Sequence, residues 1–196
     1  MKEEWRIPTR IAIATGMENN FANEGVGGMG FFVEVNGKTV LSKVQNYDFS
    51  DVALVTITGS KNDRYTVPLG TADDDEDART TCGAIRKCIK TIAAKNPSTQ
   101  IVIMQPLPGG VDGSVDDVWN SAPPGAKWSV MQYDREVSKL CRDEHVGYVN
   151  WVESSLCRNW KYVGYNGSNT PNYTHPTDDE AYLLLGEFIA GKIRAL

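Results

Sequence analysis

Several features that mark common protein classes are missing from this chain of 196 residues. No apolar stretch approaches the roughly 20 residues that a membrane-spanning helix needs, so no membrane span is predicted. Lysine and arginine form no dense patch and the net charge is −5, which argues against a nucleic-acid partner. The stretch Met1–Trp5 is polar and acidic, so it lacks signal-peptide character. These absences predict a soluble protein and leave its compartment open.

Cysteine is also scarce. The four cysteines show no C-x-x-C spacing, which argues against a zinc or thioredoxin-like site, and no metal or organic cofactor is implied. Cys141 and Cys157 could form a disulfide in an oxidising compartment. The acidic run at residues 73–77 is interpreted as a solvated loop before a helix rather than as a metal site.

The chain holds only two histidines. His145 lies in a polar run and is interpreted as a solvated helix end. His175 is followed by Pro176 and then by a C-terminal amphipathic helix, an arrangement that can hold an imidazole rigidly. Because the unperturbed pKa of histidine lies near neutrality, His175 is a candidate general base.

The residues that are present predict a single α/β domain over residues 1–196. Apolar, β-branched runs at residues 53–58, 100–104 and 146–151 are typical of buried strands. Between and after them, apolar residues recur at spacings of three and four, which predicts helices whose inward residues are Cys82, Ile85, Ile89 and Ile92, then Val130, Tyr133, Val137 and Leu140, and last Tyr182, Leu185, Ile189 and Ile193. This alternation predicts a parallel sheet covered by helices, with a ligand crevice at the carboxyl ends of the strands.

Polar residues follow the first of these strands. Gly59-Ser60-Lys61-Asn62-Asp63 comes directly after residue 58, and an asparagine placed there can point its amide N–H at a developing oxyanion, a contribution of about 3 kcal/mol. The same residue types are also ordinary turn formers. Upstream, Asn23-Glu24-Gly25-Val26-Gly27-Gly28 is a glycine-rich turn whose spacing does not fit a dinucleotide-binding fingerprint.

Taken in order, the 23–28 turn, the 51–63 block and His175-Pro176 before the last helix resemble the SGNH (GDSL-like) hydrolases, with a likeness that spans roughly residues 20–196. The resemblance implies a three-layer α/β/α sandwich, flavodoxin-like, with about five mostly parallel strands. It implies hydrolysis of a small ester, often an acetyl group on a carbohydrate. Gly28 and Asn62 would then form the oxyanion hole and His175 would be the base, while Gly27, Ser60 and Asp63 are expected to contact the substrate.

Two departures from this family's pattern concern the chemistry. The nucleophile block Gly-Asp-Ser is absent from the chain, and the position three residues before His175 is Asn172 where the family has an aspartate. Asn172 can still accept a hydrogen bond from the imidazole, but it cannot stabilise an imidazolium with a charge. Ser60 stands where glycine is usual, and its position beside Asn62 makes it a poor substitute nucleophile.

The N-terminus allows two alignments. Either Arg10–Ala14 is the first strand, or Trp5–Met17 is the helix that follows the nucleophile block, in which case the first strand and its serine lie upstream of Met1. A sheet without that strand would expose unpaired edges, so either Ile7–Ala14 or a strand from a partner chain or second copy is expected to fill the gap. The first of these possibilities favours the strand alignment.

Three functions remain open from the sequence. The first is an ester hydrolase whose serine block is supplied from outside this chain or from an upstream segment. The second is a degenerate, non-catalytic SGNH domain that binds a glycan or a protein partner. The third is a structural domain of a larger assembly.

Overall fold

The computed structural model forms two compact units, and each is described here by itself. The central unit comprises Val26–Pro106 and Trp119–Tyr148, and the terminal unit comprises Met1–Gly25, Leu107–Val118 and Val149–Leu196. Within them the structure describes residues 6–59, 61–106, 122, 124–150, 153–154, 163–165, 171–176 and 179–196, with the backbone alone described at 163–165, 171–176 and 179.

The sheet of the central unit is built from the predicted strands. Strand β1 (Leu54–Thr58) pairs in parallel with β2 (Gln100–Met104), in a register that sets Leu54 opposite Gln100 and Thr58 opposite Met104. Strand β3 (Gly147–Val149) completes the order β1-β2-β3. The predicted α/β class is confirmed, although this sheet has three strands in the described residues where about five were expected.

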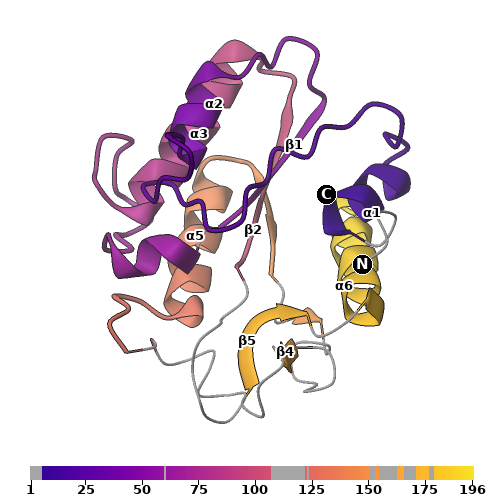
Figure 1. The fold of residues 1–196 in the computed structure, drawn as a ribbon. Helices are drawn as coiled ribbons and strands as arrows, with labels where there is room; N and C mark the ends of the chain where they lie inside the picture. The colour runs from indigo at the N-terminus through magenta and orange to yellow at the C-terminus, as the bar shows by residue number, and fades with distance from the viewer. Residues whose placement is uncertain are drawn as a thin grey trace. The chain divides into compact units, whose positions relative to one another are not determined.

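Three helices accompany this sheet, and Figure 1 shows two of them, α2 (Val40–Asn46) and α3 (Thr81–Lys95), side by side. Helix α5 (Val130–Asp143) also contacts α3. Each helix begins at a hydroxyl N-cap that accepts a backbone N–H, a preferred way to satisfy the first amides of a helix; the caps are Thr39, Thr80 and Ser129. Every inward residue predicted for α3 and α5 is buried, which confirms both helical patterns.

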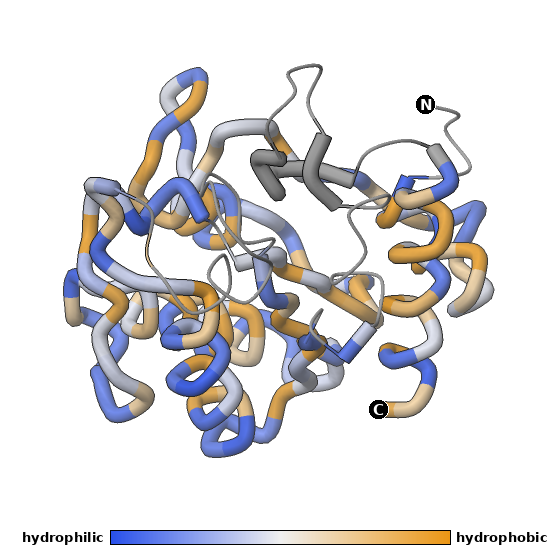
Figure 2. Tube along the Cα trace, turned by 90° about the horizontal axis from the view of Figure 1, so that it is seen from below, coloured by the Kyte–Doolittle hydropathy of each residue, from blue (hydrophilic) through white to orange (hydrophobic). Residues whose placement is uncertain are grey.

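The terminal unit pairs the two ends of the chain. Helix α1 (Ile7–Ala14) lies beside α6 (Asp179–Arg194), as Figure 1 shows. The two helices approach closely at Gly186, where an added Cβ atom would lie 2.9 Å from the Cβ of Arg10. In Figure 2 hydrophobic residues recur along α6, interleaved with hydrophilic ones. Of the predicted inward residues, Leu185, Ile189 and Ile193 are buried and Tyr182 is half-buried. Two short strands, β4 (Val163–Tyr165) and β5 (Pro171–Pro176), form an antiparallel pair.

The strand interpretation of the N-terminus is wrong. Residues 7–14 form α1, which has proline in its first turn, a position where the missing N–H costs nothing. Ile11 and Ala12 are buried, so the helix contributes one apolar face to the terminal unit. Ile7–Ala14 therefore adds no strand to a sheet, and the helical conformation expected within Trp5–Met17 is confirmed; that this helix follows a nucleophile block stays a prediction.

The structure also describes the second histidine, three of the cysteines and the acidic loop. His145 is exposed, with a left-handed φ of 56°, directly after α5, as expected of a solvated helix end. Cys82, Cys88 and Cys141 are free, buried thiols, and burial raises the pKa of each to about 12; Cys157 lies outside the described residues. The acidic loop bears ion pairs such as Asp73 with Lys139 at 2.8 Å. Among the described residues no cluster of three potential metal ligands occurs, and none of the helices is long and apolar enough to cross a membrane.

Arg86 ties the acidic loop to the helices, which leads to a prediction. Its Nε donates to Glu144 Oε1 at 2.7 Å, and its terminal nitrogens donate to the carbonyl oxygens of Ala72 (2.9 Å) and Asp74. We expect Arg86→Met to lower the free energy of unfolding by about 2–4 kcal/mol, because it leaves a carboxylate and two carbonyls without their donor.

Urea denaturation measures this loss. Arg135→Met is the matched control: the Arg135 side chain is 74% exposed, and its loss should change stability by less than about 0.5 kcal/mol. Equal effects of the two substitutions would contradict the structural role of Arg86.

Candidate functional site

The candidate site begins where β1 ends. Gly59 follows the strand, and its N–H donates to the Met104 carbonyl at 2.8 Å. A Cβ atom at Gly59 would lie 2.1 Å from the hydroxyl oxygen of Tyr133, so only glycine allows the strand to pass this close to α5. Ser60 lies outside the described residues, and the chain then enters the short 3-10 helix η2 (Lys61–Tyr65), which carries Asn62 and Asp63.

Asn62 contacts the glycine-rich turn, although 33 residues separate the two partners in the chain. Its side-chain Nδ2 donates to the Met29 carbonyl at 3.3 Å. The turn is closed by the Met29 N–H, which donates to the Val26 carbonyl at 3.2 Å, and Gly28 occupies it with a φ of 82° that favours glycine. Gly27 and Gly28 are both exposed. The structure thus brings together Asn62 and the turn that holds Gly28, the two sequence-predicted oxyanion residues.

Asp63 anchors the segment that follows this turn. Its carboxylate is fully buried and accepts hydrogen bonds from the backbone N–H groups of Phe31 (2.6 Å), Phe32 (2.8 Å) and Val33 (3.3 Å). A Cβ atom at Gly30 would lie 2.6 Å from Asp63 Oδ1, so the close approach requires glycine there. In the structure Asp63 therefore holds the 30–33 backbone in place; its predicted contact with a substrate stays a prediction.

A polar cluster lies next to these strand ends. Tyr148 Oη donates to Asp134 Oδ1 at 3.0 Å, and Gln105 Nε2 donates to the same oxygen at 3.3 Å. Burial raises the pKa of Tyr148, with further contributions from Tyr133 and Asp134, so the hydroxyl stays protonated and remains a donor. The fully buried Tyr133 hydroxyl has no hydrogen-bond partner within the described part of the chain, and burial raises its pKa well above the usual value.

His175 and Asn172 belong to the other unit. Both lie on β5, whose Pro176 pairs with Val163 and whose Pro171 pairs with Tyr165 of β4. The two predicted residues thus share one short strand that leads toward α6. The roles of His175 as the base and of Asn172 as the residue that orients it stay predictions.

Sequence reasoning missed the residues that hold Asn62 and Asp63 in place. The Met29 carbonyl and the amides of Phe31–Val33 act through the backbone, so the residue types at those positions carry no signal for them. Gly30 and Gly59 were the visible signals, because each is a glycine at a turn or strand end, where a close approach of another group is common.

Comparison with known proteins gives the class of the fold. No protein-family model matches the chain, and no curated protein matches it. Among solved structures, the carbohydrate acetylesterase Est24 from Sinorhizobium meliloti has 15% identity and a TM-score of 0.65, and the match covers 100% of this chain and 87% of that one. The aryl esterase of M. smegmatis has 14% identity and a TM-score of 0.64, again with 100% and 87% covered. A candidate GDSL-like lipase from Bacteroides ovatus has 13% identity and a TM-score of 0.61, with 100% and 81% covered.

These similarities confirm the expected fold. The chain has the fold of the SGNH (GDSL-like) hydrolases. The solved structures to which it is similar are named as an acetylesterase, an aryl esterase and a GDSL-like lipase. At 13–15% identity the likeness establishes the fold and leaves the chemistry of this chain to its own residues.

The Asp63 anchor leads to a testable prediction. We expect Asp63→Asn to accelerate hydrogen exchange at the Phe31 and Phe32 amides and to lower the free energy of unfolding by about 1–3 kcal/mol, because an amide offers one acceptor oxygen where the carboxylate offers two. Hydrogen exchange resolved by NMR measures the effect. Asp48→Asn is the matched control, since Asp48 is exposed and accepts only a local bond from Ser50 at 3.0 Å. Unchanged exchange at Phe31 and Phe32 would show that Asp63 does not hold this loop.

Lys61 gives the site a pH dependence. Burial lowers the pKa of Lys61 from 10.5 to about 8, and the charge of Arg64 adds to this shift. Between these two values the unfolded chain binds more protons than the folded one, so the contribution of Lys61 to stability rises as pH increases through this window. We therefore expect the wild type to gain stability relative to a Lys61→Met variant as the pH rises from 8 to 10.5.

Thermal unfolding across this pH range measures that difference. The exposed Lys38 offers the control, and Lys38→Met should follow the wild-type pH profile in parallel. A Lys61→Met profile that is also parallel to the wild type would show that the pKa of Lys61 is not lowered in the folded chain.

Proposed function

We propose that this chain is an SGNH-type ester hydrolase that acts on a small acyl ester, such as an acetyl group on a carbohydrate. The observation that supports this most is the contact of the Asn62 amide with the Gly28–Met29 turn at the carboxyl end of β1. Ester hydrolysis passes through a tetrahedral intermediate with a negatively charged oxygen, and fixed N–H donors stabilise that oxygen. Solved structures with this fold include a carbohydrate acetylesterase and an aryl esterase.

The proposal gives the named residues separate roles. The Gly28 N–H and the Asn62 amide donate to the oxyanion, and His175 removes the proton from the attacking group. Asn172 orients the imidazole through its side-chain oxygen, with less stabilisation of the imidazolium than an aspartate gives. Gly27, Ser60 and Asp63 lie next to these donors in the sequence and are proposed to border the substrate. The nucleophile is not assigned to a residue of the sequence shown.

Two sequence observations favour a second function. The chain has no Gly-Asp-Ser block, and Asn172 stands in place of the aspartate. Both changes are expected where catalysis is no longer required. The second candidate is therefore a degenerate, non-catalytic SGNH domain that binds a glycan or a protein partner.

The edge of the sheet supports a further proposal, that another chain pairs with it. Strand β1 is an end strand of the sheet that the described residues form. An end strand offers unpaired N–H and carbonyl groups to another strand. We therefore retain the proposal that a second copy of the chain, or a strand-donating partner, pairs there; light scattering of the purified chain would test it.

Hydrolysis of p-nitrophenyl acetate by the full chain tests the enzyme. We expect Asn62→Ala to lower kcat by about 10²–10³-fold, since it removes one oxyanion donor. His175→Ala should remove nearly all activity, because no base then activates the nucleophile. His145→Ala, which changes the exposed second histidine, is the control and should keep full activity.

The same experiment separates the two candidate functions. A chain that hydrolyses the ester no faster than its His175→Ala variant would overturn the hydrolase and favour the binding domain. If the activity depends on His175, labelling with a fluorophosphonate followed by mass spectrometry would locate the nucleophilic serine. Circular dichroism of each variant shows whether a lost activity reflects lost folding.

A further inference from the structure

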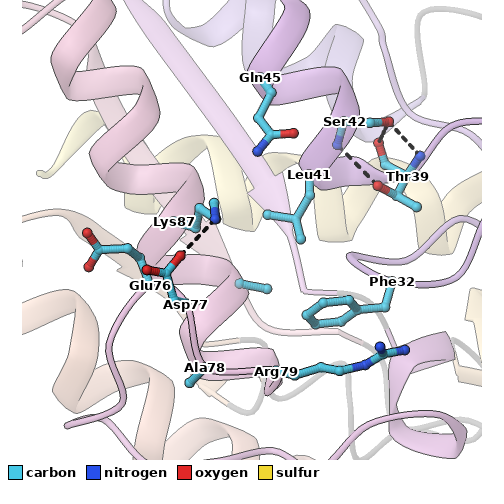
Figure 3. Close-up of a pocket in the computed structure, with 11 residues that line it drawn as sticks. Phe32, Thr39, Leu41, Ser42, Gln45, Glu76, Asp77, Ala78, Arg79 and Lys87 are labelled. Atoms are coloured by element: carbon cyan, nitrogen blue, oxygen red, sulfur yellow. Dashed lines mark hydrogen bonds and ion pairs between the residues drawn. The ribbon is translucent and has the colours of Figure 1, made fainter.

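The central unit has a pocket that contains none of the predicted site residues (Figure 3). Its volume is about 330 Å³, at the lower end of the range of about 300–1,000 Å³ typical of small-molecule sites. The walls come from α2 and its N-cap, from the acidic loop and from the first turns of α3. Phe32, Leu41 and Ala84 supply apolar surface, and Gln45, Arg79 and Lys87 supply polar groups.

Most polar groups of this pocket already have partners. Lys87 Nζ pairs with Asp77 at 3.1 Å, as the dashed line in Figure 3 shows, and Glu76 pairs with Lys90 at 2.5 Å. Thr39 and Ser42 form a reciprocal capping box, with bonds of 2.9 and 3.1 Å between backbone N–H and hydroxyl. These groups therefore contribute little to the binding of a ligand.

Arg79 and Gln45 are the exceptions. Within the residues that the structure describes, neither the Arg79 guanidinium nor the Gln45 side-chain amide takes part in a hydrogen bond or an ion pair. The Arg79 Cζ atom lies 5.9 Å from the centroid of the Phe32 ring, and Figure 3 shows the two side chains next to each other. Contact with an aromatic ring holds a guanidinium while its five N–H donors stay available.

Arg79 is the lining cation that has no carboxylate partner within the described part of the chain. The lining residues carry two positive charges, on Arg79 and Lys87, and two negative ones, on Asp77 and Glu76; Lys87 pairs with Asp77, and Glu76 pairs with Lys90, which does not line the pocket. A single negative charge on a ligand would pair with Arg79. A dianion would carry a second charge close to the carboxylates of Asp77 and Glu76.

We infer that this pocket binds a small organic carboxylate with an apolar body. The planar guanidinium of Arg79 matches a carboxylate in a bidentate arrangement. The Phe32 ring, Leu41 and Ala84 offer the apolar surface against which the body of the ligand packs. The Gln45 amide adds a donor and an acceptor at the opposite wall (Figure 3). This site is separate from the proposed ester hydrolysis and does not depend on it.

NMR titration of the full chain with phenylacetate tests the inference. We expect saturable shift changes at the amides of Phe32, Arg79 and Ala84. Phenylacetamide, the neutral analogue of the same shape, should bind at least about 10-fold more weakly, because it offers the guanidinium one neutral acceptor oxygen where the carboxylate offers two charged ones. Inorganic phosphate, which lacks an apolar body, should also bind at least about 10-fold more weakly.

Substitutions complete the test. Arg79→Gln should weaken phenylacetate binding at least about 10-fold, and Arg135→Gln, which changes an exposed arginine outside the pocket, should leave it unchanged. Because Arg79 is exposed, its variant is expected to fold, and its unfolding temperature checks this. Absence of saturable binding, equal binding of phenylacetamide or phosphate, or a wild-type affinity in Arg79→Gln would each overturn the inference.

Discussion

The buried carboxylate of Asp63 is the constraint on which the arrangement of the central unit depends. Three backbone amides from Phe31 to Val33 converge on it, and burial of a carboxylate is tolerated only when such donors replace the water it loses. Asn62, the preceding residue, binds the Met29 carbonyl two residues before Phe31. One short 3-10 helix thus fixes the position of a whole loop through backbone contacts on both sides of Gly30.

Two regions with proposed functions share this loop. On one side, the exposed Gly28 turn and the Asn62 amide form the proposed oxyanion site. On the other, the Phe32 ring lines the pocket proposed for carboxylates, while its own N–H is bound to Asp63 at 2.8 Å. A change at Asp63 is therefore expected to disturb both regions, whereas Arg79 affects the pocket alone. The remaining residues of the proposed chemistry, His175 and Asn172, lie on β5 of the terminal unit.

Much of the fold could be predicted because periodic burial leaves a strong pattern in the sequence. The inward residues of α3 and α5 were identified from spacings of three and four, and β2 matched the apolar run at 100–104. Residues 7–14 were ambiguous because a short apolar run suits a strand and a helix equally. Proline in the first turn and the contact with α6 make this segment a helix.

The sequence by itself determined the α/β class, the order of the main elements and the residue types available at the strand ends, since these follow from local periodicity and turn chemistry. Only the tertiary structure decided that Asn62 contacts Met29, that Asp63 is taken up by backbone amides, and that Arg79 lies against Phe32 in a pocket. Such contacts join residues about 30 to 50 positions apart through backbone atoms or surface side chains. Backbone donors are the same in every residue type except proline, so the sequence does not reveal which of them meet.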